Sequence, residues 1–257
     1  MLGAIIGDIV GSRFEFNNTN RYDFDMFTRE STFTDDTICT IAIADAISSG
    51  KSYQDSLLEW CRRYPNPKGA YGGSFARWIA SDNPQPYNSF GNGSAMRVSP
   101  VALAFDTLKE VQEEAKKTAL VTHNHPEGIK GAVAVAHAIY YLRTTHDLPR
   151  LEKEMDRYYP RFMLGNYFSG VFDETCMGTV PLCLKLVLSS TSFEDAIRRA
   201  ISWGGDSDTI GAIVGSMAEA QWDIPKEIID KALDLLPTEM LNVIGDFFHK
   251  LNERLLK

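Results

Sequence analysis

The sequence predicts an all-α protein that folds as one compact domain. Apolar residues recur with helical spacing through most of the chain, alternation typical of strands is scarce, and prolines and glycines fill the remaining segments. Ile38, Ile41 and Ala42, for example, share one face of a helix. With 257 residues and a hydrophobic fraction of 44%, the chain can form one large core. Because no linker or solenoid repeat divides it, we expect a single domain over residues 1–257.

The expected helices follow one another with recognisable breaks. In the first half they lie near residues 2–11, 37–49, 52–64 (before Pro65 and Pro67), 74–81 (before Pro84 and Pro86) and 95–105. In the middle they lie near 108–121, 127–145 (after Pro126), 150–158 (after Pro149) and 176–189. The last are 193–202 (capped by Ser192), 209–221, 225–235 (after Asp223 and Pro225) and 238–256 (after Pro237). Pro181 falls inside one expected helix, which is therefore kinked or begins later.

Composition limits the partners and the compartment. A formal net charge of −8 and a pI near 5.2 repel a phosphate backbone, which argues against free nucleic acid as a partner. The four cysteines form no CxxC pair, which argues against a disulfide framework and a structural zinc site and indicates a reducing compartment. The N-terminus lacks a basic signal-like start, and no segment approaches about 18 consecutive apolar residues. We therefore expect a cytoplasmic protein without a membrane partner.

One acidic cluster, Thr34-Asp35-Asp36, directly precedes the apolar run that begins at Ile38. Its hydroxyl and carboxylates fall at the first turn of a helix. Threonine and aspartate are preferred helix caps, and aspartate in the first turn complements the helix dipole. Taken alone, this cluster is therefore typical of a cap.

A second acidic cluster, Asp206-Ser207-Asp208-Thr209, follows two glycines and opens another apolar helix. In an extended segment, Asp206 and Asp208 would point to the same side. Clustered carboxylates repel one another unless cations lie between them, and oxygen donors alone favour Mg²⁺, Mn²⁺ or Ca²⁺ over zinc. Two such ions, about 3.5–4 Å apart, could activate water or clamp a diol. That the two clusters meet in space is a hypothesis at this point.

Five motifs, in this order and spacing, resemble those of the ADP-ribosylglycohydrolases, the group that contains dinitrogenase reductase-activating glycohydrolase. They are Gly7-Asp8-Ile9-Val10-Gly11 with Glu15, Phe33-Thr34-Asp35-Asp36-Thr37, Gly91-Asn92-Gly93-Ser94-Ala95-Met96-Arg97, Thr122-His123-Asn124-His125-Pro126, and Gly204-Gly205-Asp206-Ser207-Asp208-Thr209-Ile210-Gly211. The resemblance covers residues 3 to about 220. It implies a compact orthogonal helical bundle, a centre of two Mg²⁺ or Mn²⁺ ions, and hydrolysis at C1″ of the distal ribose of ADP-ribose.

The resemblance also implies roles for individual residues. By motif position, the metal ligands would be Thr34, Asp35, Asp36, Asp206, Asp208 and Thr209. Glu15 matches a glutamate that, in some branches of the family, lies over the metals and orients substrate or water; the alternative is a solvated loop carboxylate. Glu15, Asp35 and Asp36 are the candidate catalytic carboxylates, and the pattern does not identify the base. Asp8 is expected to support helix packing.

The glycine-rich loop, with Ser89, Phe90, Gly91, Asn92 and Gly93, should bind substrate. Free backbone N–H groups where such a loop enters a helix suit a diphosphate, although the isolated pattern is also typical of a plain turn. The ring of Phe90 could then stack on adenine or serve as an exposed hydrophobic anchor.

Following the family, His123 should hydrogen-bond the phosphate or ribose, while His125 is structural. Tyr71-Gly72-Gly73 should form a loop at the rim, either touching the ligand or acting as a hinge. Arg97 is expected to be an ion-pair partner.

These observations predict a metal-dependent enzyme that removes ADP-ribose from an ADP-ribosylated protein or small molecule and releases ADP-ribose as product. A two-metal nucleotide phosphohydrolase could use the same oxygen ligands. A non-catalytic ADP-ribose-binding protein is the third alternative, because a fold does not by itself establish activity. The acceptor is not readable from the sequence.

Overall fold

The structure is a computed structural model that describes residues 1–255. It confirms the all-α class, because every named element is helical: α1 (Leu2–Gly11), α2 (Asp35–Ser49), α3 (Tyr53–Arg63), α4 (Gly73–Ala80), α5 (Gly93–Met96), α6 (Ser99–Ala104), α7 (Leu108–Leu120), α8 (Pro126–Thr145), α9 (Leu148–Met155), a short 3-10 helix (Phe162–Leu164), α10 (Cys176–Leu188), α11 (Phe193–Trp203), α12 (Ser207–Gln221), α13 (Lys226–Leu233) and α14 (Thr238–Leu255). The last residue of the helix expected at 238–256, and the end of the expected domain, lie outside the described residues.

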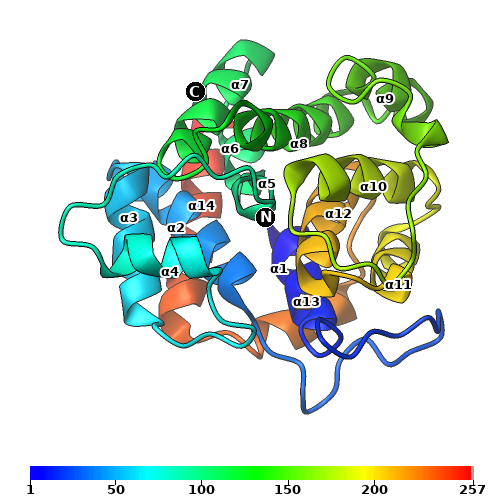
Figure 1. Cartoon of the computed structure of the whole chain (residues 1–257), viewed down its shortest axis with the longest axis horizontal. Helices are drawn as coiled ribbons and strands as arrows, with labels where there is room; N and C mark the ends of the chain where they lie inside the picture. Colours follow the sequence, from blue (N-terminus) through cyan, green and yellow to red (C-terminus); the bar gives the residue numbers. More distant parts are fainter. Residues whose placement is uncertain (256–257) are drawn as a thin grey trace.

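Helices α1 and α12 form the central pair of the bundle (Figure 1). Their backbones are nearly in contact: a Cβ atom at Gly7 would lie 1.9 Å from the carbonyl oxygen of Gly211, and one at Gly11 would lie 2.5 Å from that of Ser207. Only glycine allows this approach, because any side chain would collide with backbone. The N-terminal end of α12, which carries the second acidic cluster, is thereby held against the C-terminal end of α1.

Three groups of helices surround this pair. In Figure 1, α2, α3 and α4 lie on one side, α10 and α11 on the other, and α7, α8 and α9 along the top. A continuous apolar core, including the fully buried Ile5, Ile41, Ile139 and Phe193, joins all of them. Within residues 1–255, no helix combines the length and hydropathy needed to cross a bilayer.

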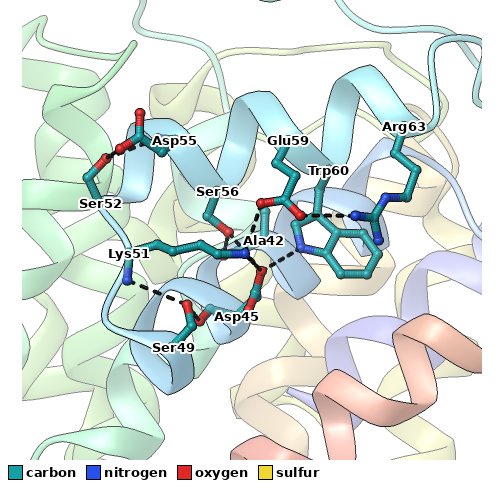
Figure 2. Close-up of polar contacts among 10 residues, drawn as sticks. All are labelled: Ala42, Asp45, Ser49, Lys51, Ser52, Asp55, Ser56, Glu59, Trp60 and Arg63. Carbon is teal, nitrogen blue, oxygen red and sulfur yellow. Dashed lines mark hydrogen bonds and ion pairs between the residues drawn. The ribbon is translucent and has the colours of Figure 1, made fainter.

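Helix α2 is fixed against α3 by a polar network around Asp45 (Figure 2). The Asp45 carboxylate accepts hydrogen bonds from Lys51 Nζ at 3.1 Å and from the indole Nε1 of Trp60 at 2.9 Å. Nearby, Ser56 donates its hydroxyl proton to the backbone oxygen of Ala42 at 2.7 Å. A partly buried carboxylate with several donors holds the two helices in one register, which fixes the direction of α2 and of the acidic cluster at its start.

Prolines affect two of the expected helices differently. The segment 95–105 forms two short helices, α5 and α6, because Pro100 has no N–H to continue α5 and instead occupies the first turn of α6. Pro181, in contrast, lies inside α10, which continues from Cys176 to Leu188.

Isolated backbone bridges tie the long connections to the helix ends. Thr34 pairs with Lys68, and Gly91 pairs with Thr175. The first bridge places the loop 66–73 beside the start of α2. The second places the glycine-rich loop beside the start of α10. These bridges bring three loops around the N-terminal ends of α2 and α12.

Candidate functional site

A cavity of about 460 Å³ lies where α2 and α12 begin. Most of the predicted site residues line it: Glu15, Asp35, Asp36, Ser89, Gly91, Asn92, Gly93, His123, Asp206, Asp208 and Thr209. The predicted rim loop, Tyr71-Gly72-Gly73, also lines it. Thr34 and Phe90 are not among the lining residues.

The two acidic clusters meet in the wall of this cavity. The Thr209 hydroxyl donates a hydrogen bond to Asp36 Oδ2 at 3.2 Å, and burial together with the charge of Asp208 across the same wall raises the pKa of Asp36. The expectation that Asp206 and Asp208 lie on an extended segment is wrong, because α12 begins at Ser207. Asp206 is its N-cap and Asp208 lies in its first turn. Both clusters therefore lie at the positive end of a helix dipole.

Burial makes this wall unfavourable for ionised acids. It raises the pKa of Asp36 and Asp208 well above the usual range, and the neighbouring carboxylates raise it further. The pKa of Asp35 is raised in the same direction by burial, then by Cys39 and Asp208. The pKa of Asp206 is raised to about 6, because the effect of burial exceeds the opposing effect of the hydrogen bond from Asn92. Without cations, the cluster therefore retains protons at neutral pH.

The residues present fit hard divalent cations. The Oδ1 atoms of Asp36 and Asp208 are buried without a hydrogen-bond partner in the described part of the chain, and a buried unpaired oxygen is costly unless a ligand uses it. The surrounding donors are carboxylates and a hydroxyl, which suit Mg²⁺ or Mn²⁺. Within residues 1–255 no three acidic, histidine or cysteine side chains already enclose an ion.

Asp8 connects α1 to the first cluster. Its buried carboxylate accepts hydrogen bonds from Thr34 N at 2.9 Å, Thr34 Oγ1 at 2.7 Å and Thr37 N at 3.0 Å, and from the Thr37 hydroxyl. Thr34 is fully buried, and its Oγ1 also accepts a hydrogen bond from Asp36 N. One lone pair on that hydroxyl remains for a metal, so Thr34 has the least freedom among the predicted ligands.

Glu15 lies on the loop after α1 and faces the cavity beside Gly69. A Cβ atom at Gly69 would lie 2.5 Å from Glu15 Oε2, and this oxygen has no hydrogen-bond partner among the described residues. Burial and then the charge of Asp208 raise the pKa of Glu15 to about 8, against the opposing effect of Lys68. The Glu15 side chain can therefore hold a proton at neutral pH.

The glycine-rich loop is fastened to the acidic wall. Asn92 Nδ2 donates to Asp206 Oδ2 at 2.7 Å and to Thr179 Oγ1 at 3.1 Å, while the Asn92 backbone N–H bonds to Glu174 O at 2.7 Å. The Gly91 N–H is taken by the Ser89 hydroxyl at 3.1 Å. The helix that follows, α5, has only four residues, so its dipole is small. The N–H groups at Gly93 and Ser94, in its first turn, are the ones the helix itself does not use.

The two histidines of the Thr122–Pro126 motif have different environments. His123 lines the cavity, and burial followed by the charge of Arg97 lowers its pKa well below the usual range. His125 caps α8, because its Nδ1 accepts the Glu127 N–H at 3.1 Å. Phe90 packs edge-on against His125, with ring centroids 5.3 Å apart. Phe90 therefore belongs to the outer side of the loop rather than to the cavity wall.

Several cavity residues were not identified from the sequence: Phe16, Gly69, Ala70, Ser74, Phe75, Tyr87, Phe172 and Glu174. Phe172 and Glu174 come from the long connection between the expected helices 150–158 and 176–189. Long connections with little secondary structure are often functional, and the length of this connection is the only feature of the sequence that points to Phe172 and Glu174 as site residues. Arg97 also lines the cavity, and its guanidinium donates to oxygen atoms of Thr118 and Thr122 rather than serving as the expected ion-pair partner.

Comparison with known proteins identifies the family. The family model described as ADP-ribosylglycohydrolase matches residues 1–257. ADP-ribosylhydrolase ARH3 of Xenopus tropicalis is 26% identical over 171 residues, which cover 55% of this chain and 48% of that protein, so the chain spans about half the length of this relative. The ADP-ribosyl-[dinitrogen reductase] glycohydrolase of Rhodospirillum rubrum is 22% identical over 259 residues, covering 90% of this chain and 87% of that protein.

A solved structure supports the same fold. An ADP-ribosylglycohydrolase-related protein complex superposes with a TM-score of 0.73 at 21% identity, covering 96% of this chain and 96% of that chain. The family model spans the whole chain. The chain therefore belongs to the ADP-ribosylglycohydrolase family.

Proposed function

We propose that this protein hydrolyses the bond between C1″ of the distal ribose of ADP-ribose and an acceptor group, releasing ADP-ribose. One observation carries the proposal: two acidic clusters, whose residues Asp36 and Thr209 are 173 positions apart in the sequence, form one wall of a cavity whose other walls carry the glycine-rich loop and His123. The names of the two relatives, which act on ADP-ribosyl groups, agree with it.

Asp35, Asp36, Asp206, Asp208 and Thr209, with Thr34 as a sixth ligand, would hold two Mg²⁺ or Mn²⁺ ions. When bound, such ions supply positive charge that orients the ribose diol and stabilises developing negative charge. The chain's own contribution is geometric. The contact of α1 with α12, the Asp8 hydrogen bonds to α2, and the Thr209–Asp36 bond fix the two ligand groups relative to each other.

Glu15 is the carboxyl group that we assign to proton transfer near C1″, with Asp35 and Asp36 as the alternatives. Its pKa of about 8 lets it hold a proton in the metal-free protein, and nearby cations would lower that pKa toward the working pH. In the reaction, water adds to C1″ and the bond to the acceptor breaks. A proton from Glu15 passes to the leaving acceptor atom, and a proton of the attacking water restores the carboxyl group.

The acceptor would enter at the open end of the cavity. Phe16 and Phe172 stand there as an exposed aromatic pair, with ring centroids 6.0 Å apart and planes inclined by 20°. Both rings line the cavity, and Phe16 directly follows Glu15. Exposed aromatic rings at a cavity mouth provide contact area for a bound partner. The diphosphate would then extend inward, toward Gly93 and His123.

The decisive experiment is mass spectrometry of products from a panel of ADP-ribosylated arginine, serine and nucleic-acid substrates, incubated with Mg²⁺ or Mn²⁺. We expect intact ADP-ribose and the unmodified acceptor from at least one substrate. Release of AMP or inorganic phosphate would instead identify a nucleotide phosphohydrolase. Tight binding of ADP-ribose without turnover of any substrate would identify a binding protein.

A further inference from the structure

A buried guanidinium lies behind His123. Only 1% of Arg97 is exposed, and Arg97 Nη2 donates to the backbone oxygen of Thr118 at 3.0 Å and to the Thr122 hydroxyl at 2.8 Å. The same Thr122 hydroxyl lies 2.7 Å from Nδ1 of His123. A continuous chain of hydrogen bonds thus runs from Arg97 through Thr122 to a residue that lines the cavity.

The donors and acceptors in this chain determine the direction of each bond. A hydroxyl has one proton and two lone pairs, and a guanidinium can only donate. One lone pair of Thr122 Oγ1 is therefore used by Arg97. The Thr122 hydroxyl can therefore direct its proton at Nδ1 of His123, which lies 2.7 Å away.

A histidine that accepts a hydrogen bond at Nδ1 carries its proton on Nε2 when it is neutral. The pKa of His123 is lowered by burial and by the charge of Arg97, so the ring is neutral at physiological pH. Its Nε2 faces the glycine-rich loop: a Cβ atom would lie 3.2 Å from Nε2 at Gly93 and 3.5 Å at Gly91. The Nε2–H group is thus directed at the part of the cavity where the glycines leave room for a ligand.

We propose that Arg97 and Thr122 are positioning residues that hold His123 in its Nε2–H tautomer, so that the ring presents a hydrogen-bond donor to an anionic oxygen of the ligand. The identity of that ligand, an ADP-ribose diphosphate, rests on the proposed function. The tautomer itself is a property of the free protein. A neutral donor also makes this contact independent of pH between 6 and 8, roughly the range in which an ordinary histidine loses its charge.

The first test is a nitrogen NMR spectrum of the free protein labelled with ¹⁵N-histidine. The chain has five histidines, and the His123 signals are assigned as those lost in His123→Gln. We expect Nδ1 of His123 to show the shift of an unprotonated ring nitrogen and Nε2 that of a protonated one, unchanged from pH 6 to pH 8. Protonation at Nδ1, or at both nitrogens in this range, would overturn the proposal.

The second test uses substitutions at Thr122 and calorimetric titration with ADP-ribose. Thr122→Val removes the hydroxyl at nearly constant shape, so His123 should populate both tautomers and ADP-ribose should bind about tenfold more weakly, the usual effect of one hydrogen bond. Thr122→Ser should restore both the tautomer and the affinity. Thr118→Val is the matched control: Thr118 is also buried, and its hydroxyl bonds to the Ala115 backbone oxygen rather than to His123.

The outcomes separate this inference from the proposed function. An unchanged tautomer and unchanged affinity in Thr122→Val would refute the relay. If Thr122→Val fails to fold, the wild-type spectrum still decides the question, because protonation of His123 at Nδ1 would refute a hydrogen bond donated by Thr122. If the wild-type protein does not bind ADP-ribose at all, the proposed function fails, while the tautomer measured in the free protein continues to test the role of Arg97 and Thr122.

Discussion

Replacing Asp206 by asparagine should stabilise the metal-free protein while abolishing its ability to bind metal. Asp206 is buried, and its pKa is raised from 3.8 to about 6. An acid whose pKa is higher in the folded state is protonated more readily there than in the unfolded chain. Ionisation of Asp206 therefore does not destabilise the folded state below about pH 4, and it destabilises the folded state by the full amount above about pH 6.

The magnitude follows from this difference in pKa. At about 1.4 kcal/mol for each pH unit, the charge of Asp206 costs the folded metal-free protein about 3 kcal/mol at pH 8. Asparagine removes that cost, and the pKa of about 6 already includes the stronger hydrogen bond that Asn92 Nδ2 makes to the charged carboxylate. The gain of about 3 kcal/mol should raise the melting temperature by about 6–12 °C at pH 8.

The assay is thermal unfolding in a chelator at pH 8 and pH 4, repeated at pH 8 with Mn²⁺. Asp206→Asn should unfold at a higher temperature than wild type at pH 8 in chelator, and should not be stabilised by Mn²⁺. Asp195→Asn is the control, for which we expect the opposite change in stability. Burial raises the pKa of Asp195, but hydrogen bonds from Tyr22 and Arg199 lower it by a larger amount, so the folded pKa lies below the usual value. The folded state therefore favours the charged carboxylate, and Asp195→Asn should lose stability. An equal gain for Asp206→Asn at both pH values, or a loss at pH 8, would refute the reasoning.

Four further predictions follow from the site. Glu15→Gln should keep metal content and ADP-ribose affinity while lowering turnover by about 10²–10⁴-fold; near-normal turnover would transfer the proton step to Asp35 or Asp36. Asp8→Asn replaces one of the two accepting oxygens by an N–H donor, so the four hydrogen bonds from Thr34 and Thr37 can no longer all form, and Mn²⁺ affinity should fall in a calorimetric titration; unchanged affinity would show that Asp8 serves packing alone. The wild-type protein in chelator should lose stability as pH rises from about 4 to 8, because Asp206 and Glu15 have raised pKa values of about 6 and 8 in the folded state. Melting curves measured with Mn²⁺ should show a smaller loss. An increase in the stability of the metal-free protein over this pH range would contradict the raised pKa values. Phe172→Ala should raise the KM for an ADP-ribosylated protein without changing ADP-ribose affinity, whereas Phe168→Ala, which removes a more exposed ring that does not line the cavity, should change neither.

The sequence was sufficient for the fold class and for most of the cavity wall. Helical spacing of apolar residues is set by the α-helix itself, so an all-α chain could be recognised without tertiary information. The predicted residues of the two acidic clusters, apart from Thr34, line the cavity. The meeting of the clusters, however, depends on the close contact of α1 with α12, and helical spacing cannot report the distance between two helices.

Errors at individual residues have local causes. Asp206 and Asp208 were assigned to an extended segment because the glycines before them hid the true start of α12 at Ser207. Of the two positions open to Phe90 from the sequence, stacking on adenine or an exposed anchor, the structure shows an exposed ring that packs against His125 outside the cavity wall. Phe172 and Glu174 lie in a connection without periodicity, so their position depends on the bridge between Gly91 and Thr175. Such tertiary contacts carry no signature in a single sequence.

The most direct test of the account is a titration of metal-free protein with Mn²⁺, in which bound ions are counted by native mass spectrometry and products are measured in the same samples. The account predicts no hydrolysis in the absence of metal, full activity at two ions per chain, and intact ADP-ribose as the nucleotide product. Hydrolysis by the metal-free protein, full activity with a single ion, or release of AMP in place of ADP-ribose would contradict it.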